Sequence, residues 1–270
     1  MTRRAEFLER QAAIVGDESI EVGGRPVRLL TAGEPSGEVV LLITGPGRGV
    51  LADSALLLPM LARRRRVAAL DLAGLRDPMA EAAEAVGAAL DRLGADDAIV
   101  VGHSLGAAVA ITAADAQARI RALVLVAGWL RPTERLATLA RLWQALPAEP
   151  RADLARLVGV RSLPELGPGR PAPLAVDSDL LGAAARADAS AAAGRLRLPV
   201  LVVGCSADSV VGIEGAEALL GAIDDARYAV VDSGHAVLAE RPAELLALLE
   251  HFLADPHGDP AGSVLPRMTV

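Results

Sequence analysis

The chain has 270 residues, of which 52% are hydrophobic and 23% charged, so it can fill the core of one ordinary domain, with or without an insertion. The formal net charge of −7 argues against nucleic acid or an anionic membrane as the main partner, and the lone cysteine, Cys205, excludes an intramolecular disulfide and a cysteine cluster that binds a metal. Because residues 1–10 lack the apolar stretch of a signal peptide and no apolar run could span a bilayer, we expect a cytoplasmic protein.

The chain opens with a predicted short helix at residues 5–13 and an antiparallel hairpin at residues 19–30, where Gly23-Gly24 separates two apolar stretches. Apolar stretches typical of buried strands then recur, at residues 39–44, 67–72, 98–101, 122–127, 199–203 and 228–231. Most of them are followed by segments with helical spacing, at residues 52–61, 79–93, 107–116, 215–223 and 242–252. This alternation predicts an α/β fold with a mostly parallel sheet covered by helices on both faces.

The alternation is interrupted once, over residues 130–196, where no convincing strand occurs. One helical face is shared by Leu136, Leu139, Ala140, Trp143 and Leu146, and residues 180–195 predict a further helix. Between them, residues 147–150 form a connector that contains two prolines. This part of the chain therefore resembles a helical insertion between two strands, at the end of the sheet where a site would lie.

These patterns divide the chain into three parts. We assign residues 1–129 and 197–254 to a core and residues 130–196 to a helical cap. The final residues, 255–270, are rich in proline and glycine, which predicts a loosely ordered tail.

The junction between the strand at 98–101 and the helix after it carries the pentapeptide Gly-His-Ser-Leu-Gly, residues 102–106. Where a strand turns sharply into a helix, the two backbones nearly touch, and the flanking Gly102 and Gly106 avoid a clash with a Cβ. The middle residue, Ser104, then lies above the carboxyl ends of the strands, with the positive end of the helix dipole behind it. We predict that Ser104 is a nucleophile; the alternative is a glycine-rich turn with an incidental serine.

A serine hydroxyl needs a base within hydrogen-bond reach, and that base needs a carboxylate to orient it. Among the four histidines, His103 lies inside the turn, where its side chain should point elsewhere and pack beside the sheet. His251 and His257 belong to the closing helix and the tail, and we expect both at the surface. His235 follows the last strand and precedes the last helix, which places it at the same edge of the sheet as Ser104. We therefore predict His235 as the base, against the alternative of a structural loop histidine.

The carboxylate should come from a loop at the same edge of the sheet. Asp208 fits, because it follows the strand at 199–203 and its loop can lie beside the loop of His235. Asp232 is the competitor, although its position three residues before the histidine keeps it at the strand end. Cys205 is expected to be a small buried residue, since no base lies near it in the sequence.

At this point the chain resembles the α/β-hydrolase family, whose nucleophile, acid and base follow the order Ser104, Asp208, His235. The motif at 102–106 matches the nucleophile elbow of that family, and the segments 204–211 and 234–242 are similar to its acid loop and its histidine segment. The resemblance implies an eight-stranded, mostly parallel sheet with a helical cap over the site, and a nucleophile whose oxyanion is bound by two backbone N–H groups.

The resemblance also assigns those two donors. One is the N–H of the residue after the nucleophile, Leu105, and the other belongs to the third residue of a His-Gly-x-Gly motif after the third strand. This chain has Thr44-Gly45-Pro46-Gly47 there, and proline has no N–H. Either Gly47 supplies the N–H through a shifted loop, or the hole has lost a donor, a loss that costs about 2.7–4 kcal/mol of transition-state stabilisation.

The sequence thus supports two functions. The first is a serine hydrolase, without metal or organic cofactor, that cleaves a carboxylic ester, thioester or lactone. The second, motivated by Pro46, keeps the serine and histidine for a lyase, cyclase or acyl-elimination step in specialised-metabolite biosynthesis. In both cases Trp129 and Trp143 predict an apolar small-molecule substrate, unless they merely pack the cap against the sheet. A homodimer is possible on this evidence.

Overall fold

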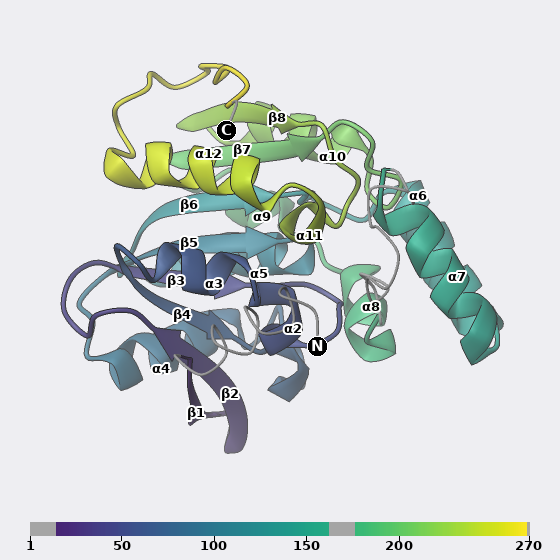
Figure 1. Cartoon of the computed structure of the whole chain (residues 1–270), viewed down its shortest axis with the longest axis horizontal. Helices are drawn as coiled ribbons and strands as arrows, with labels where there is room; N and C mark the ends of the chain where they lie inside the picture. Colours follow the sequence, from purple (N-terminus) through teal and green to yellow (C-terminus); the bar gives the residue numbers. More distant parts are fainter. Residues whose placement is uncertain (1–14, 162–175, 269–270) are drawn as a thin grey trace, which may run out of the picture.

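The computed structural model of the chain describes residues 15–161 and 176–268 (Figure 1). The short helix expected at residues 5–13 lies outside the described residues. The elements in chain order are β1 (Gly16–Val22), β2 (Arg25–Ala32), β3 (Val39–Ile43), α2 (Val50–Ser54), α3 (Leu57–Leu61), β4 (Arg66–Leu70), η1 (Leu72–Gly74), α4 (Ala82–Leu93), β5 (Ala98–His103), α5 (Leu105–Ala116), β6 (Ile120–Val126), α6 (Glu134–Ala145), α7 (Ala148–Gly159), α8 (Ser178–Ala184), α9 (Ser190–Ala193), β7 (Val200–Cys205), α10 (Ile213–Ala222), β8 (Ala226–Val231), α11 (Val237–Glu240) and α12 (Pro242–Ala254).

Eight strands form one sheet in the order β1-β2-β4-β3-β5-β6-β7-β8. The six strands β3 to β8 are parallel to one another, while β2 pairs antiparallel with both β4 and β1, and β1 and β2 are joined by the predicted hairpin turn at Gly23-Gly24. The central strands β3 and β5 are almost wholly buried, as their continuous apolar sequences predict. The expected eight-stranded, mostly parallel sheet is therefore confirmed.

Helices cover both faces of this sheet (Figure 1). One apolar core gathers side chains of α4, α5 and α10 under one face, and a second gathers those of α3 and α12 under the other. Alternate residues of each strand go to different cores; for example, Leu41 joins the first and Leu42 the second. Within the described residues, no helix is both long enough and apolar enough to cross a bilayer.

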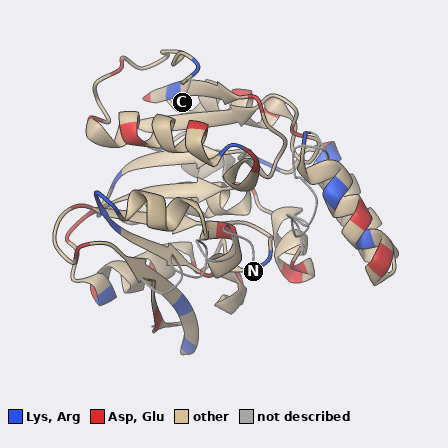
Figure 2. Cartoon of the chain, in the orientation of Figure 1, with Lys and Arg blue, Asp and Glu red and all other residues tan. Residues whose placement is uncertain are grey.

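Among the described residues between β6 and β7, four helices, α6 to α9, occupy the stretch where no strand was expected. α6 and α7 project from the body of the molecule, and α7 carries both acidic and basic side chains (Figures 1 and 2). α7 begins inside the stretch 147–150 that we interpreted as a connector, because a proline is well tolerated in the first turn of a helix. At the other end of the insertion, α9 contacts α5 and α10 and so adjoins the core layer.

Two predicted helices are each divided in the structure. The segment 52–61 forms α2 and α3, with a break around Ala55-Leu56. The segment 180–195 forms α8 and α9, because the chain leaves the helix after Ala185 and Asp188 then accepts a hydrogen bond from the N–H of Ser190 at the start of α9. In the second of these segments, a hydrogen bond from a short polar side chain thus interrupts a spacing that predicts one helix.

The final segment differs from the expected loosely ordered tail. The N–H of Tyr228 in β8 donates to the carbonyl of Ser263, and the N–H of Leu265 donates back to the carbonyl of Tyr228. The N–H of Gly262 donates to Ala226 at the start of the strand, and the side chain of Leu265 is buried. Proline and glycine set the turns of this segment, but its backbone hydrogen bonds fix it on β8.

Candidate active site

Ser104 occupies the turn between β5 and α5 with a φ of 59° and a ψ of −125°. A positive φ is strained for any residue but glycine, and such strain is kept where the surroundings impose it. Here the imposing contacts are close: a Cβ on Gly102 would lie 2.4 Å from the carbonyl oxygen of Gly106, and a Cβ on Gly106 would lie 2.0 Å from that of Ile43. The two glycines therefore hold the turn as the pentapeptide predicts.

The side chains of Ser104, His235 and Asp208 meet at the carboxyl edge of the sheet. Oγ of Ser104 lies 2.9 Å from Nε2 of His235, and Nδ1 of His235 lies 2.8 Å from Oδ2 of Asp208. All three residues are buried. The arrangement can pass a proton from the serine to the imidazole while the carboxylate orients the ring.

The loop after β7 orients the carboxylate of Asp208 toward the histidine. Its Oδ1 accepts hydrogen bonds from the N–H groups of Val210 and Val211, at 2.8 and 2.9 Å, which leaves Oδ2 for the histidine. Burial alone would raise the pKa of Asp208, but the charge and hydrogen bond of His235 and these two N–H groups together lower it. The carboxyl group is therefore ionised at neutral pH.

Asp232, the competing carboxylate, is turned away from the histidine. Its oxygens accept from the hydroxyl of Ser206 at 2.9 Å and pair with Arg161 at 2.7 Å and Arg267 at 3.4 Å. These contacts lower the pKa of Asp232, the hydrogen bond of Ser206 contributing most. Asp232 is thus part of a surface ion-pair group.

His103 makes a contact that the sequence did not indicate. Its Nε2–H donates to the backbone carbonyl of His235 at 2.9 Å, and the two rings lie 5.2 Å apart. Burial lowers the pKa of His103 to about 4, and the neighbouring His235 adds to the effect, so the ring stays neutral near neutral pH. The residue next to the nucleophile therefore helps to hold the backbone of the base.

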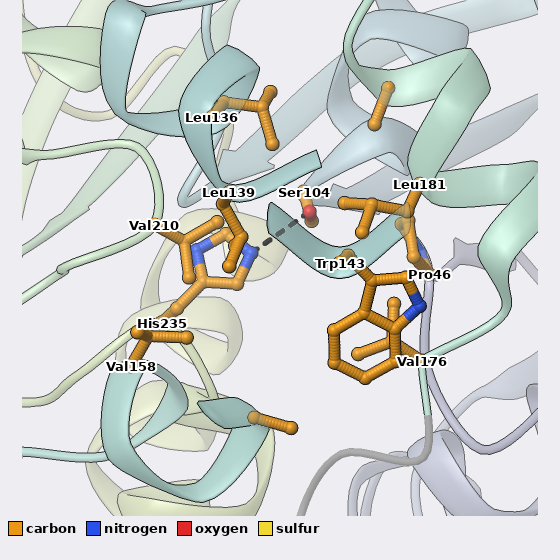
Figure 3. Close-up of a pocket in the computed structure, with 12 residues that line it drawn as sticks. Pro46, Ser104, Leu136, Leu139, Trp143, Val158, Val176, Leu181, Val210 and His235 are labelled. Carbon is orange, nitrogen blue, oxygen red and sulfur yellow. Dashed lines mark hydrogen bonds between the residues drawn. The ribbon is translucent and has the colours of Figure 1, made fainter. Parts of the chain in front are cut away.

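An apolar cavity of about 30 Å³ lies beside Ser104 and His235 (Figure 3). α6 contributes three of its side chains, Leu136, Leu139 and Trp143. The other apolar residues that line it are Pro46, Ala155, Val158, Val176, Leu181, Ala184 and Val210. The site is thus an apolar pocket in which Ser104 and His235 are the polar lining residues.

The two tryptophans have different positions. The indole of Trp143 lies in the wall of the cavity, and its Nε1–H donates to the hydroxyl of Ser178 at 3.0 Å (Figure 3). Trp129 is buried outside the described lining of the cavity, and its Nε1–H donates to the carbonyl of Ala187 at 3.3 Å. Trp129 therefore packs the insertion against the sheet, which is the alternative considered above, and the structure does not place it in the pocket.

The residues predicted for the oxyanion hole do not all lie beside Ser104. Pro46 lines the cavity with Ser104, whereas Gly47 lines a neighbouring cavity, where a Cβ on it would lie 2.0 Å from a carboxylate oxygen of Asp53. Gly45 packs directly on the turn: a Cβ there would lie 2.9 Å from both Oγ of Ser104 and the N atom of Leu105. The structure brings Pro46, Gly45 and Leu105 to the serine, and Gly47 is outside the lining of the cavity that contains Ser104. Gly45 is a site residue that the sequence analysis names only as a member of the segment at 44–47.

Comparison with known proteins agrees with this geometry. The model of the Alpha/beta hydrolase family matches residues 39–248. A curated relative, Pyrrolizixenacetamide deacetylase of Xenorhabdus hominickii, is 32% identical over 171 residues, a match that covers 57% of this chain and 64% of that protein.

Solved structures share the fold at low sequence identity. The enol-lactonase from Burkholderia xenovorans has a TM-score of 0.76 and 21% identity, with 88% of this chain and 100% of that chain covered. An esterase from Thermogutta terrifontis has a TM-score of 0.73 and 20% identity, with coverages of 90% and 99%. The family match spans most of the sheet and all three residues of the proton relay, so this chain belongs to the α/β-hydrolase family.

Proposed function

We propose that this protein is a serine hydrolase that cleaves a carboxylic ester, thioester or lactone of an apolar small molecule. The single observation that carries the proposal is the unbroken relay from Ser104 through His235 to Asp208, with distances of 2.9 and 2.8 Å. A hydroxyl that already donates to a buried imidazole is a poised nucleophile. The apolar lining of the adjoining cavity supports an apolar substrate.

The reaction would proceed in two steps. Oγ of Ser104 attacks the substrate carbonyl while its proton passes to Nε2 of His235, and the oxyanion accepts from the N–H of Leu105. The leaving group departs with the proton of His235, which leaves an acyl group on Ser104. A water molecule, deprotonated by His235, then attacks the acyl carbon, and the carboxylic acid leaves as Ser104 regains its proton.

The lining of the pocket favours a short acyl group. Apolar side chains of α6, α7 and α8 line the space beside Ser104 and His235, which suits a small apolar acyl group. The relative from Xenorhabdus is named a deacetylase, which supports the same preference. We therefore place acetyl esters first among the candidate substrates.

The test is a panel of p-nitrophenyl esters combined with a fluorophosphonate probe. We expect the probe to label wild-type protein and not Ser104→Ala, and we expect the acetate ester to be hydrolysed faster than the octanoate. An octanoate that is hydrolysed faster would overturn the short-acyl preference, and an unlabelled wild-type protein would overturn the serine mechanism.

A non-hydrolytic function is the second candidate, and Pro46 favours it. A site with a single backbone donor stabilises a tetrahedral oxyanion less well, whereas proton transfer between substrate atoms and His235 needs no such hole. Labelling of Ser104 by the probe, without turnover of any ester in the panel, would favour this alternative.

A further inference from the structure

The loop that carries His235 is attached to the end of α7. The N–H of Ala236 donates to the carbonyl of Gly159 at 2.8 Å. On the other side of the histidine, a Cβ on Gly234 would lie 2.7 Å from the N atom of Arg161 and from the carbonyl carbon of Val160. The backbone at 159–161 thus lies directly against both neighbours of His235.

The carboxylate of Glu240 also joins the two backbone segments. Its side chain is buried, with the residue only 7% exposed, and Oε2 accepts from the N–H of Gly234 at 2.7 Å and the hydroxyl of Ser233 at 2.9 Å. Its other oxygen, Oε1, accepts from the N–H of Arg161 at 2.9 Å. A buried carboxylate is stable only when its oxygens are hydrogen-bonded, so these contacts are expected to form and break together.

α7 also builds the pocket. Ala155 and Val158, on the turns just before Gly159, line the same cavity as His235 (Figure 3). A movement of the end of α7 would therefore change the pocket wall. Through the hydrogen bonds of Glu240 and Ala236, it would also move the backbone that carries His235.

We propose that Glu240 is a positioning residue that couples the position of α7 beside the pocket to the orientation of the His235 imidazole. This role rests on the proposed function, in which His235 is the base. Glu240 does not touch the substrate; it holds the backbone from which the base projects. A base that is displaced by about 1 Å can lose about 100-fold in rate.

Two substitutions remove this coupling at different ends. Glu240→Gln leaves one oxygen and one NH2 group, so either the N–H of Arg161 or the N–H of Gly234 loses its acceptor, whichever way the amide is turned. Arg161→Pro deletes the N–H that donates to Oε1, and Val160 already has the extended backbone, φ −122° and ψ 150°, that a residue before proline adopts. Arg161→Ala is the matched control, because it removes the same ion pair with Asp232 but keeps the N–H.

We expect Glu240→Gln and Arg161→Pro each to lower kcat for p-nitrophenyl acetate by about 100-fold, with a much smaller change in KM. Arg161→Ala should stay within about twofold of wild type, since an exposed ion pair contributes little. The double variant should be no slower than the slower single variant, because both changes break one network. Circular dichroism and the Tm of each variant show whether it is folded.

Several results would overturn the coupling. One is an unchanged kcat in folded Glu240→Gln; another is a loss in Arg161→Ala equal to that in Arg161→Pro; a third is an effect confined to KM. If Glu240→Gln fails to fold, Arg161→Pro against Arg161→Ala decides alone. Absence of probe labelling and turnover in wild-type protein would instead overturn the proposed function, and the coupling with it, so the two failures are distinguishable.

Discussion

Pro46 is the residue that we expect to limit the chemistry of Ser104 most. It lines the same cavity as Ser104, and the resemblance of its segment to the family motif implies a backbone donor at this position. Because a proline nitrogen carries no hydrogen, we expect only the N–H of Leu105 to remain from the pair. Its neighbour Gly45 is pressed against the serine turn, so a shift of the loop toward the serine is sterically restricted. We therefore expect the loss of one oxyanion donor to follow from the local sequence.

Replacing Pro46 by alanine restores an N–H at this position. We expect Pro46→Ala to raise kcat for p-nitrophenyl acetate by about tenfold or more, with an upper limit set by the roughly 10²–10³-fold value of one oxyanion donor. Steady-state kinetics measure this, and Pro46→Ala combined with Ser104→Ala serves as the inactive control. An equal or lower kcat would mean that position 46 does not face the oxyanion.

At the scale of the elements, the strand–helix junction of β5 and α5 depends on close backbone contact. Gly106 lies on the first turn of α5, where a Cβ would meet the carbonyl of Ile43 in the neighbouring β3 at 2.0 Å. Backbone cannot move aside as a flexible side chain can, so any side chain at 106 must push α5 off the sheet and carry Ser104 with it.

We expect Gly106→Ala to lower the free energy of unfolding by at least about 1–3 kcal/mol and to abolish labelling of Ser104. Gly221 is the matched control, because it lies in α10 and a Cβ there would meet nothing within 4 Å. Gly221→Ala should be neutral or stabilising by up to about 1 kcal/mol, since alanine is the better helix former. Thermal unfolding of both variants gives the comparison, and equal destabilisation would contradict the steric argument.

The same scale shows what could be predicted from the sequence. Ser104, Asp208 and His235 each follow a parallel strand, and the carboxyl ends of parallel strands meet at one edge, so local patterns sufficed to bring them together. The contact of His103 with the carbonyl of His235 joins residues 132 positions apart, and no local pattern reports it. Likewise, the sequence could not distinguish the buried Trp129 from the pocket residue Trp143, because their directions depend on how the insertion folds back.

At the scale of the whole molecule, two partly buried titratable groups, those of His103 and Asp53, have opposite effects on stability as the pH falls. Burial lowers the pKa of His103 to about 4 from 6.5. Between these pH values the imidazole is protonated in the unfolded chain and neutral in the folded protein, so the free energy of unfolding falls as the pH falls. Burial raises the pKa of Asp53 to about 6 from 3.8, against the hydrogen bond and charge of Arg48. Between pH 6 and 3.8 the folded protein is then the better proton acceptor, so this group makes stability rise as the pH falls.

Asp53→Asn separates the two contributions. At pH 7.5 the variant lacks a buried negative charge, and we expect its Tm to exceed that of wild type by a few degrees. The difference should shrink as the pH falls toward 4, where Asp53 is already protonated in the wild-type protein, and the decline that His103 causes should become steeper in the variant. Thermal unfolding at pH 7.5, 5.5 and 4.5 measures this; a difference that does not change with pH would contradict the assigned pKa.

The chain after α12 also affects how one copy of the molecule can associate with another. β8 is the last strand of the sheet, and a bare outer strand is a template to which another polypeptide can add by backbone pairing. The stretch from Gly262 to Leu265 already satisfies backbone groups of Ala226 and Tyr228 on that side. Growth of an intermolecular sheet from this part of the strand is thereby blocked, so self-association would have to use some other surface.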